Sequence, residues 1–223
     1  MRAVLTREKG YNDTLRSWLP DGVVVSEVPL TSTRYFDPDL VGETLRANEH
    51  FGSFAALVVS SARGAPYVSL AKSALREGGQ VLAAGEATAK ALELEKITVD
   101  VVGEGGSFNL APSITEGPAL LLGAATPRDE LRVALESKGV EVVALACYET
   151  LPAALRASEA QSLREGDVIF IGAPSAWLVA QGLVRTDAVV VVPGATTAEI
   201  VRASHDRVLE GWGPELRERL ATL

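Results

Sequence analysis

The chain has 223 residues, 47% hydrophobic and 22% charged, with a formal net charge of −8 at pH 7. This ordinary globular composition allows one large α/β domain or two small ones, and an acidic chain without lysine or arginine runs excludes a generic nucleic-acid surface. No apolar run approaches the about 20 residues of a membrane span, and no signal-peptide pattern opens the chain, so we expect a cytoplasmic protein without membrane contact.

Nine apolar runs follow one another at intervals too long for hairpins, and they predict β-strands. In chain order they are RAVLT, GVVVSEVPL, AALVVSS, QVLAAG, VDVVG, PALLLGA, EVVALACY, DVIFIGA and DAVVVVPG. Apolar spacing of three or four predicts helices in YNDTLRSWLP, DLVGETLRA, EATAKALELE, PRDELRVALESKG, APSAWLVAQG and ATTAEIVRAS. Strands and helices that alternate in this way predict an α/β fold with parallel sheets and right-handed crossovers.

Weak internal repeats indicate two similar domains. Residues 4–30 resemble 121–150, and residues 57–68 resemble 169–179, but the order is not that of a tandem repeat. We therefore predict a discontinuous α/β domain of residues 1–33 plus 152–223 and an inserted α/β domain of residues 38–147. The linkers 34–37 and 148–151 would form a two-strand hinge. The alternative, that any two strand–helix units look alike, stays open.

Most sequence motifs of known chemistry are absent. GEGGSF (103–108) has Phe108 where a dinucleotide fingerprint needs glycine, and neither a P-loop nor a Gly-x-Ser-x-Gly elbow occurs. The single cysteine, Cys147, excludes an intramolecular disulfide, and with only His50 and His205 a Cys/His metal site is not expected. Cys147 lies in the apolar run VVALACY, which is typical of a buried side chain.

The candidate binding residues lie in turns that follow predicted strands, where open α/β sheets bind ligands. They are Arg7, Ser60, Ser61, Arg63, Gly85, Thr88, Ser175, Gly194, Thr196 and Thr197. The turn Gly-x-x-Thr-Ala occurs twice, as GEATA at 85–89 and GATTA at 194–198. Such turns offer hydroxyls and the N–H groups of a helix N-terminus, which attract anions. The alternative is that the serines and threonines are only helix caps.

Tyr148 is the candidate catalytic residue. It lies in ACYETLP, at the end of a predicted buried strand and the start of a predicted linker. A phenol, with an ordinary pKa near 10, can donate a proton at neutral pH. The alternative is an amphipathic aromatic side chain that packs at a domain boundary.

Six motifs, VLTRE, VVSSARGA, AAGEATA, CYET, DVIFIGAPSA and VPGATTAE, occur in an order that resembles the uroporphyrinogen-III synthase family over nearly the whole chain. The resemblance implies two flavodoxin-like parallel-sheet domains, the second inserted in the first, that face each other across a cleft and are joined by a two-strand hinge. It implies a hydro-lyase that cyclises hydroxymethylbilane to uroporphyrinogen III, with inversion of ring D and loss of water, in heme, siroheme or cobalamin biosynthesis. It implies no metal and no organic cofactor.

Residue by residue, Tyr148 matches the family tyrosine that helps the hydroxyl group leave, and Thr88 matches the threonine of the Gly-x-x-Thr-Ala turn. Ser175, Thr196 and Thr197 match the hydroxyl turns of the other lobe, whereas the segment after Ala203 does not align. We expect a monomer that binds the linear tetrapyrrole and makes at most a transient contact with the preceding pathway enzyme. Two alternatives remain, a non-catalytic two-lobed tetrapyrrole or small-molecule binding protein and a nucleotide or sugar-phosphate transferase.

Overall fold

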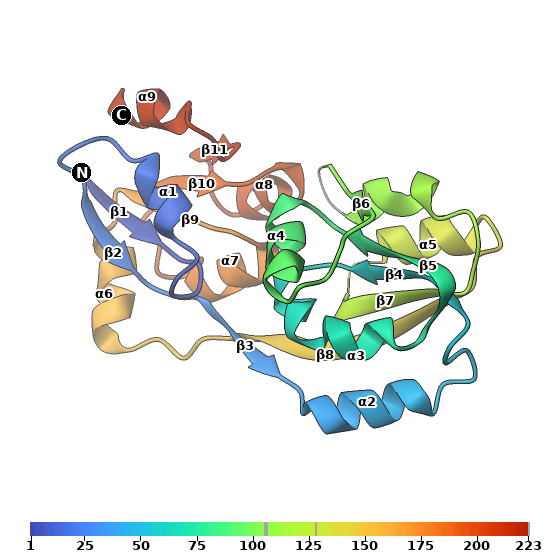
Figure 1. Ribbon diagram of the computed structural model, residues 1–223. Coiled ribbons are helices and arrows are strands. Elements are labelled where there is room, and N and C mark those ends of the chain that lie inside the picture. The colour runs from blue at the N-terminus through green and yellow to red at the C-terminus, as the bar shows by residue number, and fades with distance from the viewer. Residues whose placement is uncertain (105–106, 128, 223) are drawn as a thin grey trace. The chain divides into compact units, whose positions relative to one another are not determined.

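The protein is described by a computed structural model of residues 1–104, 107–127 and 129–222. The chain divides into two compact α/β units, each with helices along both faces of a sheet (Figure 1). Unit 1 consists of Met1–Ser32 and Thr150–Leu223, and unit 2 consists of Thr33–Glu149. This confirms the predicted fold class of two parallel-sheet α/β domains, one inserted in the other.

Unit 1 has a five-stranded parallel sheet in the order β11-β10-β9-β1-β2. Numbered within the unit, this is the flavodoxin-like order 2-1-3-4-5. The strands are β1 Arg2–Leu5, β2 Val24–Glu27, β9 Val168–Phe170, β10 Val189–Val192 and β11 Val208–Glu210. The helices are α1 Asp13–Ser17, α6 Ala157–Glu165, α7 Pro174–Ala180, α8 Ala195–Arg202 and α9 Leu216–Ala221.

The central strands of unit 1 are buried on both faces, as their continuous apolar runs predict. Successive residues of a strand point to opposite faces. In β1, Val4 packs in the cluster that contains side chains of α6, α7 and α8. Ala3 and Leu5 pack in the cluster on the other face, beneath α1 and α9.

Unit 2 has a six-stranded sheet in the order β3-β8-β7-β4-β5-β6. Without the edge strand β3, the order numbered within the unit is 3-2-1-4-5, the other common doubly wound arrangement. The strands are β3 Thr31–Tyr35, β4 Phe54–Val59, β5 Leu75–Ala83, β6 Val101–Val102, β7 Ala119–Ala124 and β8 Val142–Pro152. The helices are α2 Pro38–Arg46, the 3₁₀ helix η1 Ala62–Tyr67, α3 Val68–Lys72, α4 Glu86–Leu94, the 3₁₀ helix η2 Ser107–Ser113 and α5 Glu130–Glu136.

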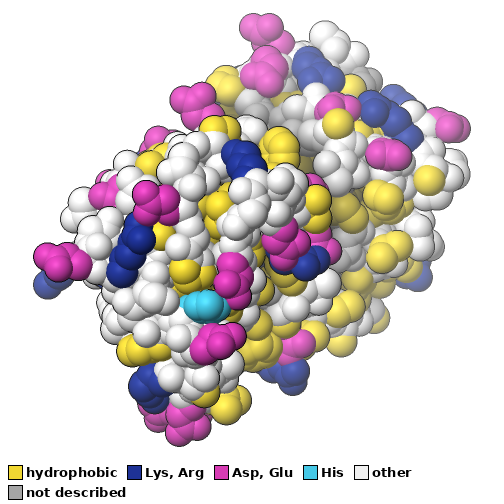
Figure 2. Space-filling view, turned by 90° about the vertical axis from the view of Figure 1, so that its right-hand side faces the viewer, with side chains coloured by type: hydrophobic (Ala, Val, Ile, Leu, Met, Phe, Trp, Pro, Cys, Tyr) yellow, Lys and Arg dark blue, Asp and Glu magenta, His cyan; other side chains and the backbone are white. Residues whose placement is uncertain are grey.

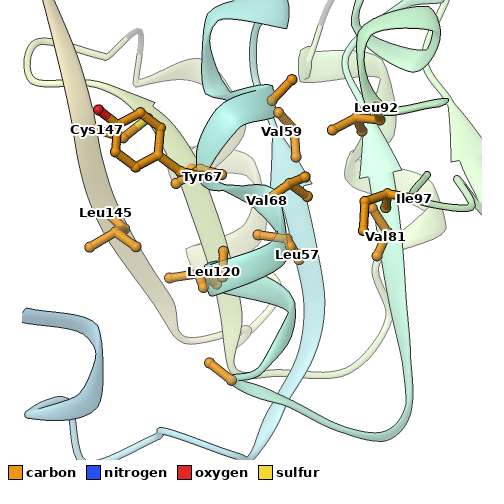
Figure 3. Close-up of a cluster of buried hydrophobic side chains, with 14 of the residues drawn as sticks. Leu57, Val59, Tyr67, Val68, Val81, Leu92, Ile97, Leu120, Leu145 and Cys147 are labelled. Atoms are coloured by element: carbon orange, nitrogen blue, oxygen red, sulfur yellow. The ribbon is translucent and has the colours of Figure 1, made fainter. Parts of the chain in front are cut away.

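One face of this sheet is covered by α2, η1, α3 and α4, and the other by η2 and α5. Figure 3 shows the first of these cores, in which Tyr67 from η1 lies beside Cys147 from β8. The helix ends follow the sequence signals. Asp37 accepts a hydrogen bond from Asp39 N (2.9 Å) at the start of α2, and Gly139 follows α5 with φ 78°.

Residues 34–37 and 148–151, expected as linkers, lie in or beside the strands β3 and β8. Within unit 2, Arg34 forms an ion pair with Glu149, and Phe36 N donates to Cys147 O (3.0 Å). The expected linkers are therefore hydrogen-bonded parts of a sheet edge. A two-residue part of the glycine-rich loop at 103–108, Gly105 and Gly106, lies outside the described residues, as does Arg128 in the segment predicted as the helix of 127–139.

Charged side chains of both signs are interspersed on the face shown in Figure 2. Many form exposed ion pairs, such as Arg132 with Asp129 (3.0 Å) and Arg156 with Glu159 (2.6 Å). Each of these pairs carries no net charge. Across residues 1–104, 107–127 and 129–222, no helix is long and apolar enough to span a membrane.

Candidate functional site

Each sheet has one point at which the strand order reverses, between β1 and β9 in unit 1 and between β4 and β7 in unit 2. In open α/β sheets, ligands bind outside the carboxyl ends of the strands at this point. Arg7 lies two residues after β1, and Ser60, Ser61 and Arg63 follow β4. The sequence therefore places polar residues at the reversal point of each sheet.

The two serines after β4 have structural partners within unit 2. Ser60 Oγ donates to Leu122 O (3.1 Å) in the neighbouring strand β7, and Ser61 Oγ accepts from Arg63 N (3.3 Å) at the start of η1. Ser61 is thus a helix cap, which was the alternative for these hydroxyls. Ser60 is exposed, and Ser61 and Arg63 are half-buried.

Thr6 makes in unit 1 the contact that Ser60 makes in unit 2. It is the first residue after β1, it is buried, and its hydroxyl donates to Phe170 O at the end of β9. Sequence reasoning missed Thr6, although it stands in VLTRE directly after a predicted strand. In both units, the hydroxyl of the residue after one strand donates a hydrogen bond to a carbonyl of the neighbouring strand at the reversal point.

The two Gly-x-x-Thr-Ala turns have the same backbone shape. Gly85 (φ 171°, ψ 174°) precedes α4, and Gly194 (φ −178°, ψ −177°) precedes α8. In each turn the glycine carbonyl accepts from the N–H groups three and four residues later, at 2.9 and 3.0 Å in the first turn and 3.2 and 3.0 Å in the second. The cap residue of each helix is a glycine, so no cap side chain takes up the N–H groups of the first turn.

The threonines of these turns are therefore not N-caps. Thr88 and Thr197 lie inside the first turn of their helices and are buried, with exposed fractions of 6% and 3%. Thr196 and Ser175 are exposed, and Ser175 follows Pro174 at the uncapped start of α7. For these four residues the helix-cap alternative is wrong, because glycine or alanine occupies the cap position.

Neither turn glycine is required by the fold of its own unit. Both have extended backbones that any residue can adopt. A Cβ on Gly194 would meet no atom of the described residues within 4 Å, and one on Gly85 would meet only Gly103 O at 3.6 Å. The glycines thus leave open space in front of two bare helix N-termini, as a close-lying anionic ligand requires.

Tyr148 reaches its position through a β-bulge. Gly123 pairs with Ala146 and Ala124 with Tyr148, so β8 has one residue more than β7 at this point. Such a bulge changes the direction of a side chain, and here it brings Tyr148 into the same buried cluster as Cys147. Tyr148 is 5% exposed, and its ring centroid lies 6.3 Å from that of Tyr35.

Two titratable groups of the cluster that contains Tyr148 have raised pKa values. Burial raises the pKa of the Cys147 thiol to about 12, and Cys147 Sγ lies 3.4 Å from Gly123 O as a donor. The pKa of Tyr67 is also raised, first by burial and then by the neighbouring groups Cys147, Tyr35 and Asp37. Cys147 is therefore a buried, unreactive side chain, as its sequence context predicts.

In unit 2 the predicted site residues lie along one edge of the sheet. Tyr148 is level with Ala124, the last residue of β7, while Ser60 follows β4 and Gly85 follows β5. In unit 1, Arg7, Ser175 and Gly194 likewise follow β1, β9 and β10. Each parallel sheet thus carries its candidate residues at its carboxyl edge.

A family model described as "Uroporphyrinogen-III synthase HemD" matches residues 20–211. The chain belongs to this family. The prediction of a uroporphyrinogen-III synthase, a cyclising lyase of tetrapyrrole biosynthesis, is thereby confirmed.

Solved structures of uroporphyrinogen-III synthases share the fold. A mutant enzyme from the extremely thermophilic bacterium Thermus thermophilus is 19% identical with a TM-score of 0.65, and the match covers 100% of this chain and 96% of that one. The enzyme from Helicobacter pylori is 18% identical with a TM-score of 0.67, over 100% and 99% of the two chains. No curated protein matched the chain by sequence.

Sequence reasoning also missed Trp212 of this synthase, which lies in the segment that did not align. Trp212 follows β11 and contacts Arg7, whose guanidinium carbon lies 5.8 Å from the indole ring. The tryptophan in EGWGP was the only available signal, and nothing in its spacing connects it with Arg7. Among the residues that the structure describes, no group of three His, Cys, Asp or Glu side chains could hold a metal ion.

Proposed function

We propose that the protein cyclises hydroxymethylbilane to uroporphyrinogen III, with inversion of ring D and loss of water, and that the carboxyl edges of both sheets bind the substrate. The observation that carries this assignment of the site is the pair of Gly-x-x-Thr-Ala turns. Both have extended glycines, open space and uncapped helices behind them. Bare N–H groups at helix N-termini suit the carboxylates of a linear tetrapyrrole.

The reaction depends more on positioning of the substrate than on its chemical activation. The linear substrate carries a reactive hydroxyl leaving group, and we expect it to close unaided to the type I isomer. The enzyme has to hold the chain so that the last ring reacts at its substituted carbon, and positioning of this kind contributes several kcal/mol to catalysis. Unit 1 supplies Arg7, Ser175, Gly194, Thr196 and Thr197, and unit 2 supplies Ser60, Ser61, Arg63, Gly85 and Thr88.

Tyr148 is the proposed proton donor. Its hydroxyl gives a proton to the departing hydroxyl group, which then leaves as water. Support comes from the bulge that turns this side chain at the carboxyl edge of the sheet, because bulges are frequent next to active sites.

Each of the two units is proposed to contribute its own part of the binding site. We propose that residues 1–33 plus 152–223 and residues 38–147 act as separate binding domains, linked by 34–37 and 148–151. The enzyme is proposed to act in the cytoplasm as a monomer, with at most a transient contact to the enzyme that supplies its substrate. Sedimentation of the purified protein tests the monomer.

An isomer-resolved assay tests the function. Hydroxymethylbilane is incubated with the protein, the products are oxidised, and type I and type III porphyrins are separated by chromatography. Type III should predominate with the protein and type I without it. Type I alone, at the rate without protein, would refute the synthase assignment and favour a tetrapyrrole-binding protein that lacks the activity.

A further inference from the structure

A cavity of about 280 Å³ lies in unit 1 at the amino ends of its strands, on the sheet edge opposite to the candidate substrate-binding turns. Its volume is close to the lower end of the range of about 300–1,000 Å³ that is typical of small-molecule sites. The lining includes two valines at the starts of β9 and β10 and four charged residues, two of each sign. They are Val168, Val189, Asp167, Arg185, Asp187 and Arg207. None of them belongs to the candidate substrate site.

One of the two pairs of opposite charge is satisfied internally. Arg185 donates to Asp187 twice, from Nε to Oδ1 (2.8 Å) and from Nη2 to Oδ2 (3.2 Å). The hydrogen bond from Arg185 lowers the pKa of the Asp187 carboxyl, so this carboxylate stays ionised and holds the arginine at neutral pH. The bidentate pair leaves Arg207 as the positive group and Asp167 as the negative group that a ligand can use.

Arg207 offers donors to the cavity. Its Nη1 donates to the backbone carbonyl of Asp187, and this bond restricts the guanidinium. Within residues 1–104, 107–127 and 129–222, Arg207 forms no ion pair with a carboxylate. The N–H groups at its Nε and Nη2 lie along one edge of the planar guanidinium, and an edge of this kind suits a carboxylate that accepts two parallel hydrogen bonds.

Asp167 offers the matching acceptor. Its Oδ2 accepts a hydrogen bond from Arg2 N (2.8 Å), which holds the carboxylate in position. Its Oδ1 lies 3.6 Å from Arg185 Nη2, beyond hydrogen-bonding distance. This oxygen therefore retains the capacity to accept a hydrogen bond from an ammonium group.

The sheet sets the distance between the two groups. Arg207 precedes β11 and Asp167 precedes β9, and β10 lies between these strands. Neighbouring strands are about 4.8 Å apart, so the two backbones are about 10 Å apart, a gap that both side chains narrow. Val168 and Val189 are paired in the sheet between them and offer apolar surface. A small ligand with both charges on one carbon atom can therefore contact both groups.

We propose that this cavity binds a zwitterionic α-amino acid with an apolar side chain, whose carboxylate is held by Arg207 and whose ammonium group is held by Asp167. A simple anion or a simple cation would leave one charged group of the cavity without a partner, whereas a zwitterion matches both. The exposed positions of the arginine and of Asp187 indicate a modest affinity. The cavity thus gives unit 1 a binding activity apart from the proposed substrate site.

NMR titration of the ¹⁵N-labelled protein tests the class of ligand with L-leucine and two analogues that each lack one charge. L-Leucine should bind with a Kd of about 1 mM. The analogue 4-methylpentanoate lacks the ammonium group, and 3-methylbutylamine lacks the carboxylate. Each should bind at least about tenfold more weakly, because each loses a hydrogen bond to a charged group. A Kd for either analogue equal to that of L-leucine would overturn the assignment of a zwitterion.

Two substitutions assign the two contacts. Arg207→Gln should raise the Kd of L-leucine about tenfold and leave that of 3-methylbutylamine unchanged. Asp167→Asn keeps an acceptor for Arg2 N and should weaken L-leucine by a similar factor, with no effect on 4-methylpentanoate. Arg132→Gln is the matched control, because Arg132 is an exposed arginine paired with an aspartate (3.0 Å) in unit 2. This variant should bind L-leucine as the unsubstituted protein does.

The backbone signals also locate the ligand. L-Leucine should shift the N–H signals of Val168 and Val189 and leave those of the turn glycines Gly85 and Gly194 in place. No shift at about 10 mM L-leucine, shifts confined to the turns, or an unchanged Kd in folded Arg207→Gln would overturn the proposal. None of these measurements involves turnover of hydroxymethylbilane, so the result is independent of the synthase activity.

Discussion

Ser60 Oγ lies 2.3 Å from the position that a Cβ on Gly123 would take. Ser60 follows β4 and Gly123 lies in the neighbouring strand β7, so the serine hydroxyl occupies space that every other residue would fill. From there it donates to Leu122 O (3.1 Å). Position 123 therefore requires glycine, because Ser60 occupies the space that a Cβ would need.

This relationship predicts non-additive effects on stability. Gly123→Ala should lower the free energy of unfolding by about 1–2 kcal/mol, because it displaces the Ser60 hydroxyl from its acceptor. Ser60→Ala should cost about 1 kcal/mol. In the double variant the added methyl group meets only the residue 60 Cβ, at 3.5 Å, so its cost should match that of Ser60→Ala alone. Urea denaturation measures all three, and additive costs would contradict the prediction.

Alanine in the glycine turns should impair binding more than folding. Gly85→Ala and Gly194→Ala place a methyl group in the open space before α4 and α8, and each should raise KM about tenfold, equivalent to about 1.4 kcal/mol. The stability cost should be about 1 kcal/mol, because alanine is a poorer N-cap than glycine. Thermal unfolding and steady-state kinetics measure the two effects.

Gly182→Ala is the matched control for these turns. A Cβ on Gly182 also meets no atom of the described residues within 4 Å, but this residue follows α7 and lies outside the candidate site. Its KM should equal that of the unsubstituted enzyme. If Gly182→Ala raised KM as much as Gly194→Ala, the effect would not arise from the turns.

Removal of the Tyr148 hydroxyl should slow catalysis. Tyr148→Phe keeps the buried ring and should lower kcat about 10- to 10³-fold, the range expected of a lost general acid, without abolishing formation of type III porphyrin. Tyr67→Phe is a useful comparison, because Tyr67 donates its hydroxyl to Phe36 O within the same core. It should lower stability by about 1 kcal/mol and leave kcat unchanged. Full activity of Tyr148→Phe in the isomer-resolved assay would remove the proposed role.

Stability should decline above pH 9. Burial raises the pKa of Cys147 from its ordinary value of 9.0 to about 12, so the unfolded chain releases this proton at a lower pH than the folded protein does. The free energy of unfolding contributed by the buried neutral thiol is complete below pH 9 and is lost as the pH rises toward 12. The raised pKa of Tyr67 acts in the same direction.

Urea midpoints measured between about pH 7 and 11 test this pH dependence, and Cys147→Ala should flatten the decline. The native thiol should also resist alkylation at about pH 8 and react only after unfolding, because it is buried and protonated. A thiol that is alkylated rapidly in the folded protein would contradict the assignment of Cys147 as buried filler.

The central strands could be predicted from the sequence because each carries its own signal. The run VVVV of β10 is buried on both faces, and a continuous apolar run is sufficient to indicate such a strand. Strand β11 was missed because its three residues VLE are only partly buried and its pairing with β10 comes from the tertiary structure. The helix α9 that follows it was missed for the same reason: its two buried leucines are too few to show a period.

Site residues could be predicted from the sequence where one short segment contains both the functional groups and the signal for the structural element that positions them. The Gly-x-x-Thr-Ala turns carry glycine, hydroxyl and helix start within five residues, and both turns could be located from the sequence. The relation between Arg7 and Trp212 joins residues more than two hundred positions apart, and only the folded sheet brings them together. The bulge at Tyr148 depends on the pairing of β7 with β8, which one strand alone does not reveal.

The insertion of unit 2 into unit 1 governs the order in which the protein can be assembled during synthesis. Strand β1 pairs with β9, and Ala3 lies opposite Val168. All of residues 33–149 leave the ribosome between these partners, and as a continuous segment they can fold first. Until then β1 has only β2 beside it, and Val4 and Leu5, which end at 1% and 0% exposure, stay uncovered. Strand β1 is therefore among the last strands of unit 1 to be buried, and a nascent chain exposes the apolar side chains of β1 until β9 has been made.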